Sequence, residues 1–251
     1  MPRTMLTEKL WLTLKPILLD LNIYDKPNLR NIFEGILFRM RTGCPWRDIP
    51  CCFGMPNTIF KAFSRWSKSN KLMQLFKNLS KDIDREWLFM DGTHVRAHQH
   101  SSGAASQKDE AISKSIGGNS SKIHMIVDAC GNPYEFLITD GTTHDAKVAP
   151  ELLSKVSLKA TEYVSADKGY DSDNLRETIT QQSVKAIIPK KRNTTANNNH
   201  MDWYIYRIRH LVENVFARLK HFRGIATRYD KLKQHYENTV ALACAYIWLK
   251  L

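Results

Sequence analysis

Apolar residues recur at helical spacing over the first third of the chain, and each such segment is amphipathic. A connector rich in Pro and Gly at 44–57 and a polar turn at Ser69–Asn70 separate the segments. For one of the helices, Asn28 is a plausible N-cap and Gly43 a plausible stop. The expected helices lie within 6–20, 28–43, 58–68 and 71–83. We therefore expect a small all-helical N-terminal domain over residues 1–82.

The pattern changes at Glu86, where short apolar runs bounded by turn residues predict β-strands. The expected strands lie at 86–92, within a hairpin at 122–141 whose turn is ACGNP, at 160–167 and at 184–189. The expected helices of this part lie at 144–156, 172–182, 206–220 and 236–250. The order of elements, β-β-β-α-β-α-β-α, predicts an α/β fold class, with helices on the faces of a mixed sheet over residues 83–251.

The charge of the chain indicates a polyanionic partner. The 251 residues carry 37 Lys and Arg against 25 Asp and Glu, a net charge of +12. The excess lies in residues 1–82 and 185–251, whereas residues 83–184 hold 10 basic residues against 15 acidic ones. An acidic centre between basic flanks suits a metal site that acts on DNA, because carboxylates bind cations and basic side chains bind phosphates.

Other compositional features exclude several classes of protein. The five cysteines include a vicinal pair but no CxxC pair, so neither a disulfide framework nor a zinc site is expected. The N-terminal apolar run is broken by Thr and Lys, which is not typical of a signal peptide. The late run VALACAYIWL is too short to span a bilayer, so we expect a cytoplasmic protein without a membrane partner.

Four apolar runs end in an aspartate, namely Asp91, Asp128, Asp140 and Asp167. If the first three strands form an antiparallel meander and a helical crossover brings the fourth back parallel to the first, Asp91 and Asp167 meet at one rim. Asp128 then lies at the far end and is expected to be a turn residue. Asp140 can share the rim, but its Asp-Gly sequence favours a turn, and Asp145 is a plausible helix N-cap.

Two ionised carboxylates at one rim repel each other unless a cation lies between them. A hard divalent cation with oxygen ligands removes this repulsion, and such pairs serve phosphate chemistry. Asp91 and Asp167 are therefore candidate metal ligands, although each precedes residues typical of turns.

The helix expected at 206–220 places Tyr206, Arg209, Glu213 and Lys220 on one stripe beside its apolar face. A separate basic face is expected to look outward to phosphates. Glu213 allows two interpretations. It can form an ordinary surface ion pair with Arg209 four residues earlier, or it can supply the third carboxylate to the site.

The spacing Tyr206-x2-Arg209-x3-Glu213-x6-Lys220 resembles the YREK signature of bacterial insertion-sequence transposases of the DDE superfamily. The segments MDGTHVRAH, TDGTTHDAKVAPELL and SADKGYDSDNLRE are similar to the insertion-sequence-five group of the IS-four-like superfamily. The N-terminal RTGCPWRDIPCCFG also resembles that group, so the resemblance covers about 28–249. The aspartate at position 140, where relatives often have proline, is a small departure from the family pattern.

The resemblance implies an RNase H-like fold and a catalytic, metal-binding triad of Asp91, Asp167 and Glu213. It implies Mg²⁺, for which Mn²⁺ can substitute, cleavage at the ends of the element, and transfer of the freed 3′-OH into target DNA. The implied partners are terminal inverted repeats, target DNA and a second copy of the chain in a synaptic dimer, with a location at the bacterial nucleoid. The candidate DNA-binding residues are Tyr206, Arg209, Lys220, Arg207, Arg218, Lys190, Lys191 and Arg192.

Several alternatives remain open at this point. The chain can be a nuclease that cuts without joining, or a DNA-binding protein derived from a transposase, although an intact triad argues against the second. The helical domain can bind DNA or another subunit. The cluster His94, His98 and His100 can share a strand face, but solvated or locally satisfied histidines are favoured there because carboxylates suit Mg²⁺ better.

Overall fold

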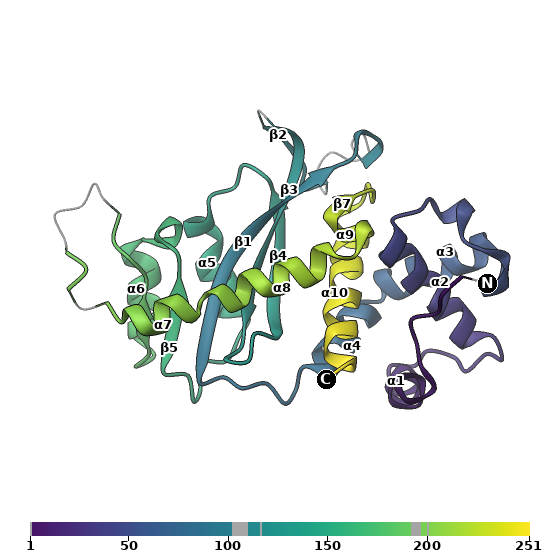
Figure 1. The fold of residues 1–251 in the computed structure, drawn as a ribbon, viewed down its shortest axis with the longest axis horizontal. Coiled ribbons are helices and arrows are strands. Elements are labelled where there is room, and N and C mark those ends of the chain that lie inside the picture. Colours follow the sequence, from purple (N-terminus) through teal and green to yellow (C-terminus); the bar gives the residue numbers. More distant parts are fainter. Residues whose placement is uncertain (1, 102–109, 116, 192–196, 200) are drawn as a thin grey trace. The chain divides into compact units, whose positions relative to one another are not determined.

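The computed structural model describes residues 2–101, 110–115, 117–191, 197–199 and 201–251, and it divides into two compact units (Figure 1). The first unit consists of Met1–Lys81, Arg96–Glu110 and Leu219–Leu251, and the second of Asp82–Val95 and Ala111–Arg218. The first segment of the first unit ends at Lys81. Residues 219–251, in contrast, belong to the same unit as the N-terminal helices, because the long C-terminal helix packs on them.

The first unit is helical, and all four N-terminal helices expected from the sequence are present. The helix that starts after Asn28 ends at Gly43, whose φ of 69° is the left-handed conformation typical of a C-cap glycine. The helices of the unit are α1 (Glu8–Asp20), α2 (Leu29–Thr42), α3 (Pro56–Lys68), α4 (Lys71–Leu79), α9 (Arg223–Ala226) and α10 (Lys233–Leu249). In the described part of this unit they are accompanied by the 3₁₀ turns η1 (Trp46–Asp48), η2 (Cys51–Phe53) and η3 (Gln99–Ser101).

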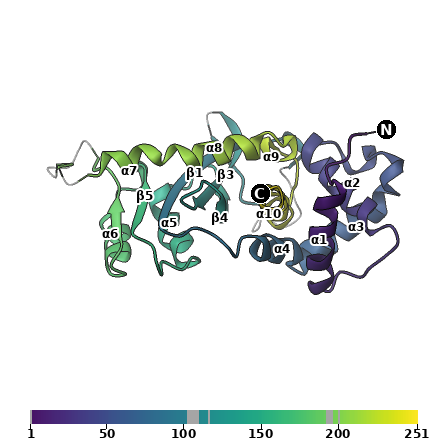
Figure 2. The same ribbon diagram turned by 60° about the horizontal axis from the view of Figure 1, so that its bottom comes forward.

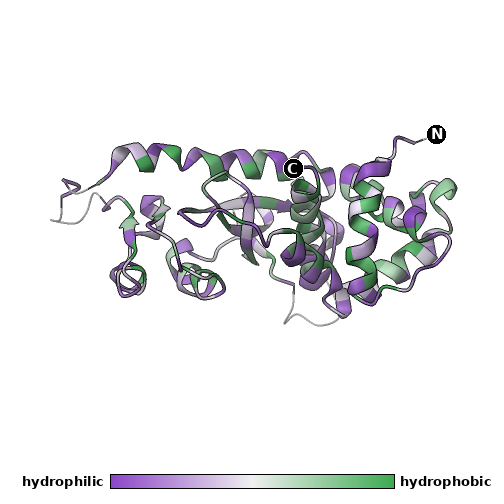
Figure 3. Cartoon of the chain, turned by 90° about the horizontal axis from the view of Figure 1, so that it is seen from below, coloured by the Kyte–Doolittle hydropathy of each residue, from purple (hydrophilic) through white to green (hydrophobic). Residues whose placement is uncertain are grey.

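Helix α10 forms the centre of the first unit. It is apolar over most of its length, which Figure 3 shows in green, and it packs against α4, α3 and α1. Residues 239–245 are all buried, which agrees with a helix that is covered on every side. A buried ion pair between Arg39 and Asp230, 2.9 Å apart, links α2 to the segment before α10.

The second unit is built on a mixed sheet, which confirms the predicted α/β class. Its strands are β1 (Trp87–Ala97), β2 (Ser113–Ser115), β3 (Gly118–Val127), β4 (Pro133–Asp140), β5 (Tyr163–Ala166) and β6 (Lys185–Ile187). The order is β2-β3-β1-β5-β6, and β4 also pairs with β3. The hairpin β3–β4 is antiparallel, whereas β1 pairs with β5, and β5 with β6, in parallel.

Strand β1 corrects one expectation, since it does not end at Asp91. The residues after Asp91 continue the strand to Ala97, where Arg96 and Ala97 pair with the short strand β7 (Thr227–Arg228) of the first unit. The continuation is consistent with the alternation of exposed Arg96 with buried Val95 and Ala97, which is the period of a half-buried strand. Asp91 therefore lies where the pairing of β1 with β5 stops.

The helices of the second unit cover both faces of the sheet. They are α5 (Asp145–Ser154), α6 (Asp173–Thr180), α7 (Trp203–Ile208) and α8 (His210–Lys220), with the 3₁₀ turn η5 (Lys168–Tyr170) after β5; the last two residues of α8 fall in the first unit. Figures 1 and 2 show α7 and α8 along one face, with α5 and α6 on the other. The apolar core between the sheet and α5 and α6 contains residues from β1, β3, β4 and β5, among them Leu88, Met90 and Val164.

Two further details differ from the expectations. The helix predicted at 206–220 begins earlier, at Trp203, because the side chain of Asp202 caps it, and it is divided into α7 and α8 at Arg209. Asp145 is the first residue of α5 and not its N-cap, which is His144. Among the described residues, no helix is long and apolar enough to cross a membrane.

Candidate active site

Asp91 and Asp167 lie side by side where the parallel ladder between β1 and β5 ends. The last residue pair of this parallel ladder is Met90 and Ala166, so each aspartate directly follows a paired residue. The backbone N–H of Gly92 donates to Asp91 Oδ1 at 2.8 Å, and that of Gly169 donates to Asp167 Oδ1 at 2.7 Å. The strand register therefore places these two aspartates next to each other, as the sequence predicted.

Glu213, on α8, is connected to Asp91 through a single arginine. Arg209 Nη1 lies 2.5 Å from Asp91 Oδ2, and Arg209 Nη2 lies 2.9 Å from Glu213 Oε1. The side chain of Glu213 is 56% exposed, whereas those of Asp91 and Arg209 are 19% and 16% exposed. The ion pair that the sequence allowed between Arg209 and Glu213 is present, and the same guanidinium also reaches a strand residue 118 positions away.

The electrostatics of Asp91 reflect this arrangement. Burial raises its pKa above the ordinary value, and the neighbouring charge of Asp167 raises it further. The N–H of Gly92 and the guanidinium of Arg209 act in the opposite direction without cancelling the effect of burial. Because burial and a like charge both oppose ionisation, additional positive charge at this rim would be stabilising.

The donor chemistry at the rim fits a hard divalent cation, although the three carboxylates do not form a closed ligand set. Across the described residues, no group of three or more His, Cys, Asp or Glu is placed to hold a metal ion. Asp91 and Asp167 are oxygen donors at adjacent strand ends, and Glu213 has an exposed carboxylate on the facing helix. Arg209 holds the position of a counter-ion between Glu213 and Asp91, so this pair would have to open for Glu213 to join the two aspartates on one metal ion.

The other predicted residues of α7 and α8 fall on two faces. The ring of Tyr206 lies 5.6 Å from the guanidinium of Arg209 and 5.7 Å from the ring of Trp203, so Tyr206 stands beside the arginine that contacts both carboxylates. Arg207 and Arg218 are exposed on the outward face of the helices. Lys220 is exposed at the last position of α8, in the first unit.

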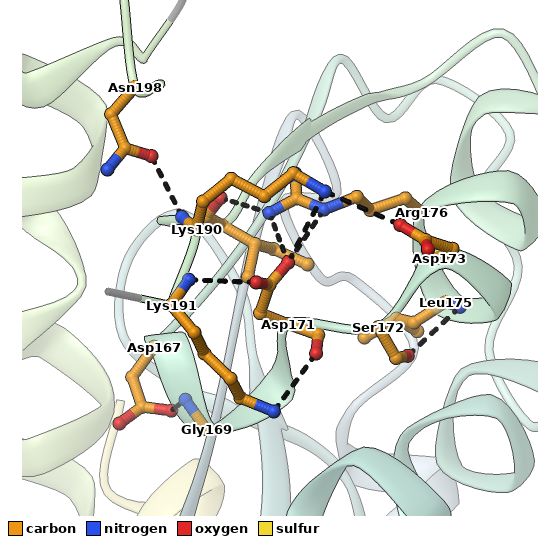
Figure 4. A network of polar contacts seen from close by, with 11 residues as sticks. Asp167, Gly169, Asp171, Ser172, Asp173, Leu175, Arg176, Lys190, Lys191 and Asn198 are labelled. Carbon is orange, nitrogen blue, oxygen red and sulfur yellow. Dashed lines mark hydrogen bonds and ion pairs between the residues drawn. The ribbon is translucent and has the colours of Figure 1, made fainter. Parts of the chain in front are cut away.

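Lys190 and Lys191 are held beside the turn that carries Asp167, as Figure 4 shows. The centre of this network is Asp171, which accepts from Arg176 Nη2 at 2.8 Å and from the backbone N–H of Lys191 at 2.9 Å. Lys190 Nζ lies 3.7 Å from Asp171 and 3.4 Å from Asp173. The third basic residue predicted there, Arg192, lies outside the described residues.

Two other strand-end aspartates serve turns, as their sequences suggested. Asp128 Oδ1 accepts from the backbone N–H groups of Cys130 at 3.0 Å and Asn132 at 2.7 Å. Asp140 accepts from the hydroxyls of Thr142 and Thr143, both at 2.6 Å. Burial alone would raise the pKa of Asp140, but these threonine hydrogen bonds outweigh it and lower the pKa to about 2.

The three histidines that follow Asp91 are in different surroundings. His94 is exposed on β1 in the second unit. His98 and His100 belong to the first unit, where their rings lie 5.0 Å apart and His98 also contacts the ring of Tyr229 at 5.1 Å.

A polar cluster that was not predicted from the sequence lies next to Asp91. Lys122 and His124 on β3 both contact Asp145, and the buried hydroxyl of Tyr170 faces the same carboxylate. A signal was present in the strand KIHMIV, because two polar residues with a period of two in an apolar run mark a polar spot on one face of a buried strand.

Comparison with known proteins places this site in a family. Residues 83–248 match the family described as "Transposase DDE domain", and residues 6–76 match the "Putative transposase of IS4/5 family (DUF4096)". The first match covers more than half of the chain, which therefore belongs to the DDE transposase family and is a DNA transposase.

Two relatives are transposases of insertion sequences. The chain is 40% identical over 130 residues to the "Putative transposase for insertion sequence element IS6501" of Brucella ovis, a match that covers 51% of this chain and 98% of that relative. It is 26% identical over 136 residues to the "Putative transposase for insertion sequence element IS402" of Burkholderia cepacia, which covers 51% of this chain and 62% of the relative.

Solved structures give a more distant similarity. A pre-cleavage Mos1 transpososome matches at 10% identity with a TM-score of 0.29, over 90% of this chain and 80% of that chain. A Mos1 transposase paired-end complex with the left transposon end matches at 10% identity with a TM-score of 0.28, over 90% and 79% of the two chains.

Proposed function

We propose that Asp91, Asp167 and Glu213 are the catalytic carboxylates of this transposase and that they bind Mg²⁺, for which Mn²⁺ can substitute. The reaction is hydrolysis of a phosphodiester at each end of the element, followed by attack of the freed 3′-OH on target DNA. The observation that supports this most strongly is the register of β1 and β5, which sets two acidic residues side by side, with Glu213 linked to one of them through Arg209.

Each residue of the site has a distinct task in this proposal. Bound Mg²⁺ supplies activation of the attacking oxygen and neutralisation of the charge that develops on the leaving oxygen. The N–H groups of Gly92 and Gly169 hold Asp91 and Asp167 in one orientation, which keeps the ligand geometry fixed. Arg209, with its two carboxylate partners, offers a planar fork that also matches the oxygens of a phosphate.

Double-stranded DNA, as terminal inverted repeats and as target, is the proposed partner of the basic residues. Tyr206 and Arg209 are proposed to contact DNA next to the cleaved bond, and Arg207 and Arg218 to contact the flanking backbone from the exposed face of α7 and α8. Lys190 and Lys191 add positive charge near Asp167, and Arg192 and Lys220 are proposed to extend the contact.

The finer architectural and assembly proposals follow from the same site. A mixed sheet with carboxylates at neighbouring strand ends, one helix facing them, fits an RNase H-like fold. Two element ends have to be held together for transposition, so we propose that a homodimer forms the synaptic complex on DNA.

The test is Mg²⁺-dependent cleavage of the repeats that flank the gene, with wild type beside Asp91→Asn, Asp167→Asn and Glu213→Gln. Each variant is expected to lose cleavage while keeping most of its DNA affinity, because the basic surface is unchanged. A Glu213→Gln variant that nicks and joins ends at the normal rate would refute the triad. Strand transfer assayed with pre-cut ends distinguishes a transposase activity from a nuclease that cuts without joining.

A further inference from the structure

We propose that Asp145 is a positioning residue that sets the spacing between Asp91 and Asp167 by supporting the part of β1 that carries Asp91 and the turn that follows Asp167. This inference rests on the proposed function of those two aspartates as metal ligands. Asp145 itself is the first residue of α5 and is not one of the residues that the DDE signature identifies.

Asp145 is held in place by two residues of β3. Lys122 Nζ lies 2.6 Å from Asp145 Oδ2, and His124 Nδ1 lies 3.1 Å from Asp145 Oδ1. Both partners are buried, since the side chain of Lys122 is 10% exposed and that of His124 is completely buried. The other ring nitrogen of His124 lies 2.9 Å from Thr139 Oγ1 on β4, so three secondary-structure elements fix the carboxylate.

The first segment that this cluster supports is the part of β1 around Asp91. Gly92 packs so closely on the cluster that a Cβ at this position would lie 2.7 Å from Asp145 Oδ1 and 2.8 Å from Lys122 Cε. The same Cβ would lie 3.3 Å from His124 Nδ1. Glycine is required here for close approach and not for an unusual backbone angle. Because Gly92 N–H orients the Asp91 carboxylate, a shift of the cluster would be transmitted to Asp91 within one residue.

The second segment is the turn that follows Asp167. Tyr170, in the 3₁₀ turn after Asp167, is 1% exposed, and its backbone N–H donates to the carbonyl of Asp167 at 3.1 Å. Burial raises the pKa of Tyr170 well above its usual range, and the charges of Asp145, Asp91 and Asp167 add to the effect. Helix α5, which begins at Asp145, packs against this 3₁₀ turn. Asp145 therefore lies beside both the cluster under Gly92 and the turn that follows Asp167.

A purely structural role would not account for this choice of residues. Apolar side chains of similar volume would fill the space between β1, β3 and α5 without the cost of burying an ammonium, an imidazole and a carboxylate. A polar network is worth that cost where it specifies one geometry, and residues that orient metal ligands act in this way. The cluster also packs against Gly92, the residue next to Asp91.

The experiment measures binding of Mn²⁺ alone to the full-length protein, by calorimetric titration, together with cleavage of the flanking repeats. Asp145→Asn removes the charge and keeps the shape, whereas Asp145→Glu keeps the charge and moves the oxygens by one methylene. Both variants are expected to weaken Mn²⁺ binding by about 10- to 100-fold, the usual effect of losing a residue that orients a ligand. Asp145→Glu is expected to be impaired as well as Asp145→Asn, because the position of the carboxylate matters and its charge alone is not sufficient.

The matched control is Asp128→Asn, a buried strand-end aspartate of the same unit that serves only its own turn. It is expected to lose thermal stability but to bind Mn²⁺ as wild type does. The inference is overturned if Asp145→Asn and Asp128→Asn bind Mn²⁺ equally well, or if Asp145→Glu behaves as wild type. Should Asp145→Asn fail to fold, Tyr170→Phe decides the question, since it removes only the hydroxyl. A several-fold weaker Mn²⁺ affinity is then expected, and an unchanged one refutes the idea.

Asp91→Asn, measured in the same titration, tests the metal site separately from the positioning role of Asp145. If Asp91→Asn loses Mn²⁺ binding and Asp145→Asn does not, the metal site stands and the positioning role is wrong. If Asp91→Asn binds Mn²⁺ with normal affinity, the metal site and the role of Asp145 are both wrong.

Discussion

Asp91, on β1, and Asp128, directly after β3, are two aspartates of the same unit, and they differ in where their partners come from. Both have a pKa that burial raises above the ordinary value. Asp128 is satisfied by its own turn, where the backbone N–H groups of Cys130 and Asn132 donate to it. Asp91 has one local donor, Gly92, and otherwise depends on an arginine 118 residues away.

The difference shows how a structural carboxylate can be distinguished from a functional one. A turn aspartate has its donors within four residues, so its charge is compensated as soon as the turn forms. The charge of Asp91 is compensated only when α8 folds back over the sheet, and it is made worse by Asp167. A site that tolerates such a conflict is suited to bind a cation, because binding relieves the conflict.

The largest difference that we expect between Asp91 and Asp128 is in catalysis. Asp91→Asn should abolish Mg²⁺-dependent cleavage of the element ends, whereas Asp128→Asn should cleave at close to the wild-type rate at a temperature where both are folded. Gel assays with labelled terminal repeats measure both rates. An Asp128→Asn variant that is folded and yet inactive would contradict a purely structural role for Asp128.

Arg209→Gln should lower the cleavage rate on the order of 100-fold, the usual effect of removing one electrostatic partner from a catalytic site. The reason is that Arg209 contacts both Asp91 and Glu213. Arg218→Gln on the exposed face of α8 is the matched control, and its maximal rate at saturating DNA should stay near that of wild type. Equal rates for the two variants would contradict a special role for Arg209.

In the absence of metal, Asp128→Asn should destabilise the protein more than Asp91→Asn does. Asp128→Asn should lower the free energy of unfolding by about 1–3 kcal/mol, because buried backbone donors lose a charged acceptor. Asp91→Asn should change it by less than about 1 kcal/mol, since the ionised carboxylate is itself disfavoured by burial and by Asp167. Urea unfolding in the presence of a chelator measures both. A large loss for Asp91→Asn would show that Asp91 is mainly structural.

Protonation of Asp145 should account for part of the stability that the protein loses at acid pH. Burial would raise its pKa, but its contacts with His124 and Lys122 outweigh burial and lower the pKa to about 2. A pKa below that of the unfolded chain gives stability that is present above about pH 4 and is lost as the pH falls toward 2. Asp145→Asn should therefore flatten unfolding free energy against pH in this window by on the order of 2 kcal/mol. An unchanged profile would show that the ion pair with Lys122 contributes nothing to stability.

The smallest effect concerns the outward basic face. Arg218→Gln should weaken binding to all DNA sequences alike and reduce the slope of log affinity against log salt by about 1, as the loss of one phosphate contact does. Fluorescence anisotropy at several salt concentrations measures the slope. A change confined to the terminal-repeat sequence would indicate a base contact instead.

The sequence by itself determined the elements and much of the pairing. Periodicity located the helices and the hairpin, and a helical crossover that returns the fourth strand parallel to the first predicts that Asp91 and Asp167 lie side by side, as they do. Local chemistry also identified Asp128 and Asp140 as turn residues, because Asp-Gly and the residues around it carry their own hydrogen-bond donors.

Only the tertiary structure decided how charges from distant segments combine. Nothing local in β1 requires it to continue past Asp91, since its continuation pairs with a two-residue strand near the C-terminus. The double role of Arg209, the attachment of Lys190 to Asp171 and the support that Asp145 gives to Gly92 each join segments far apart in the chain. Such contacts depend on the three-dimensional approach of side chains, which residue spacing does not encode.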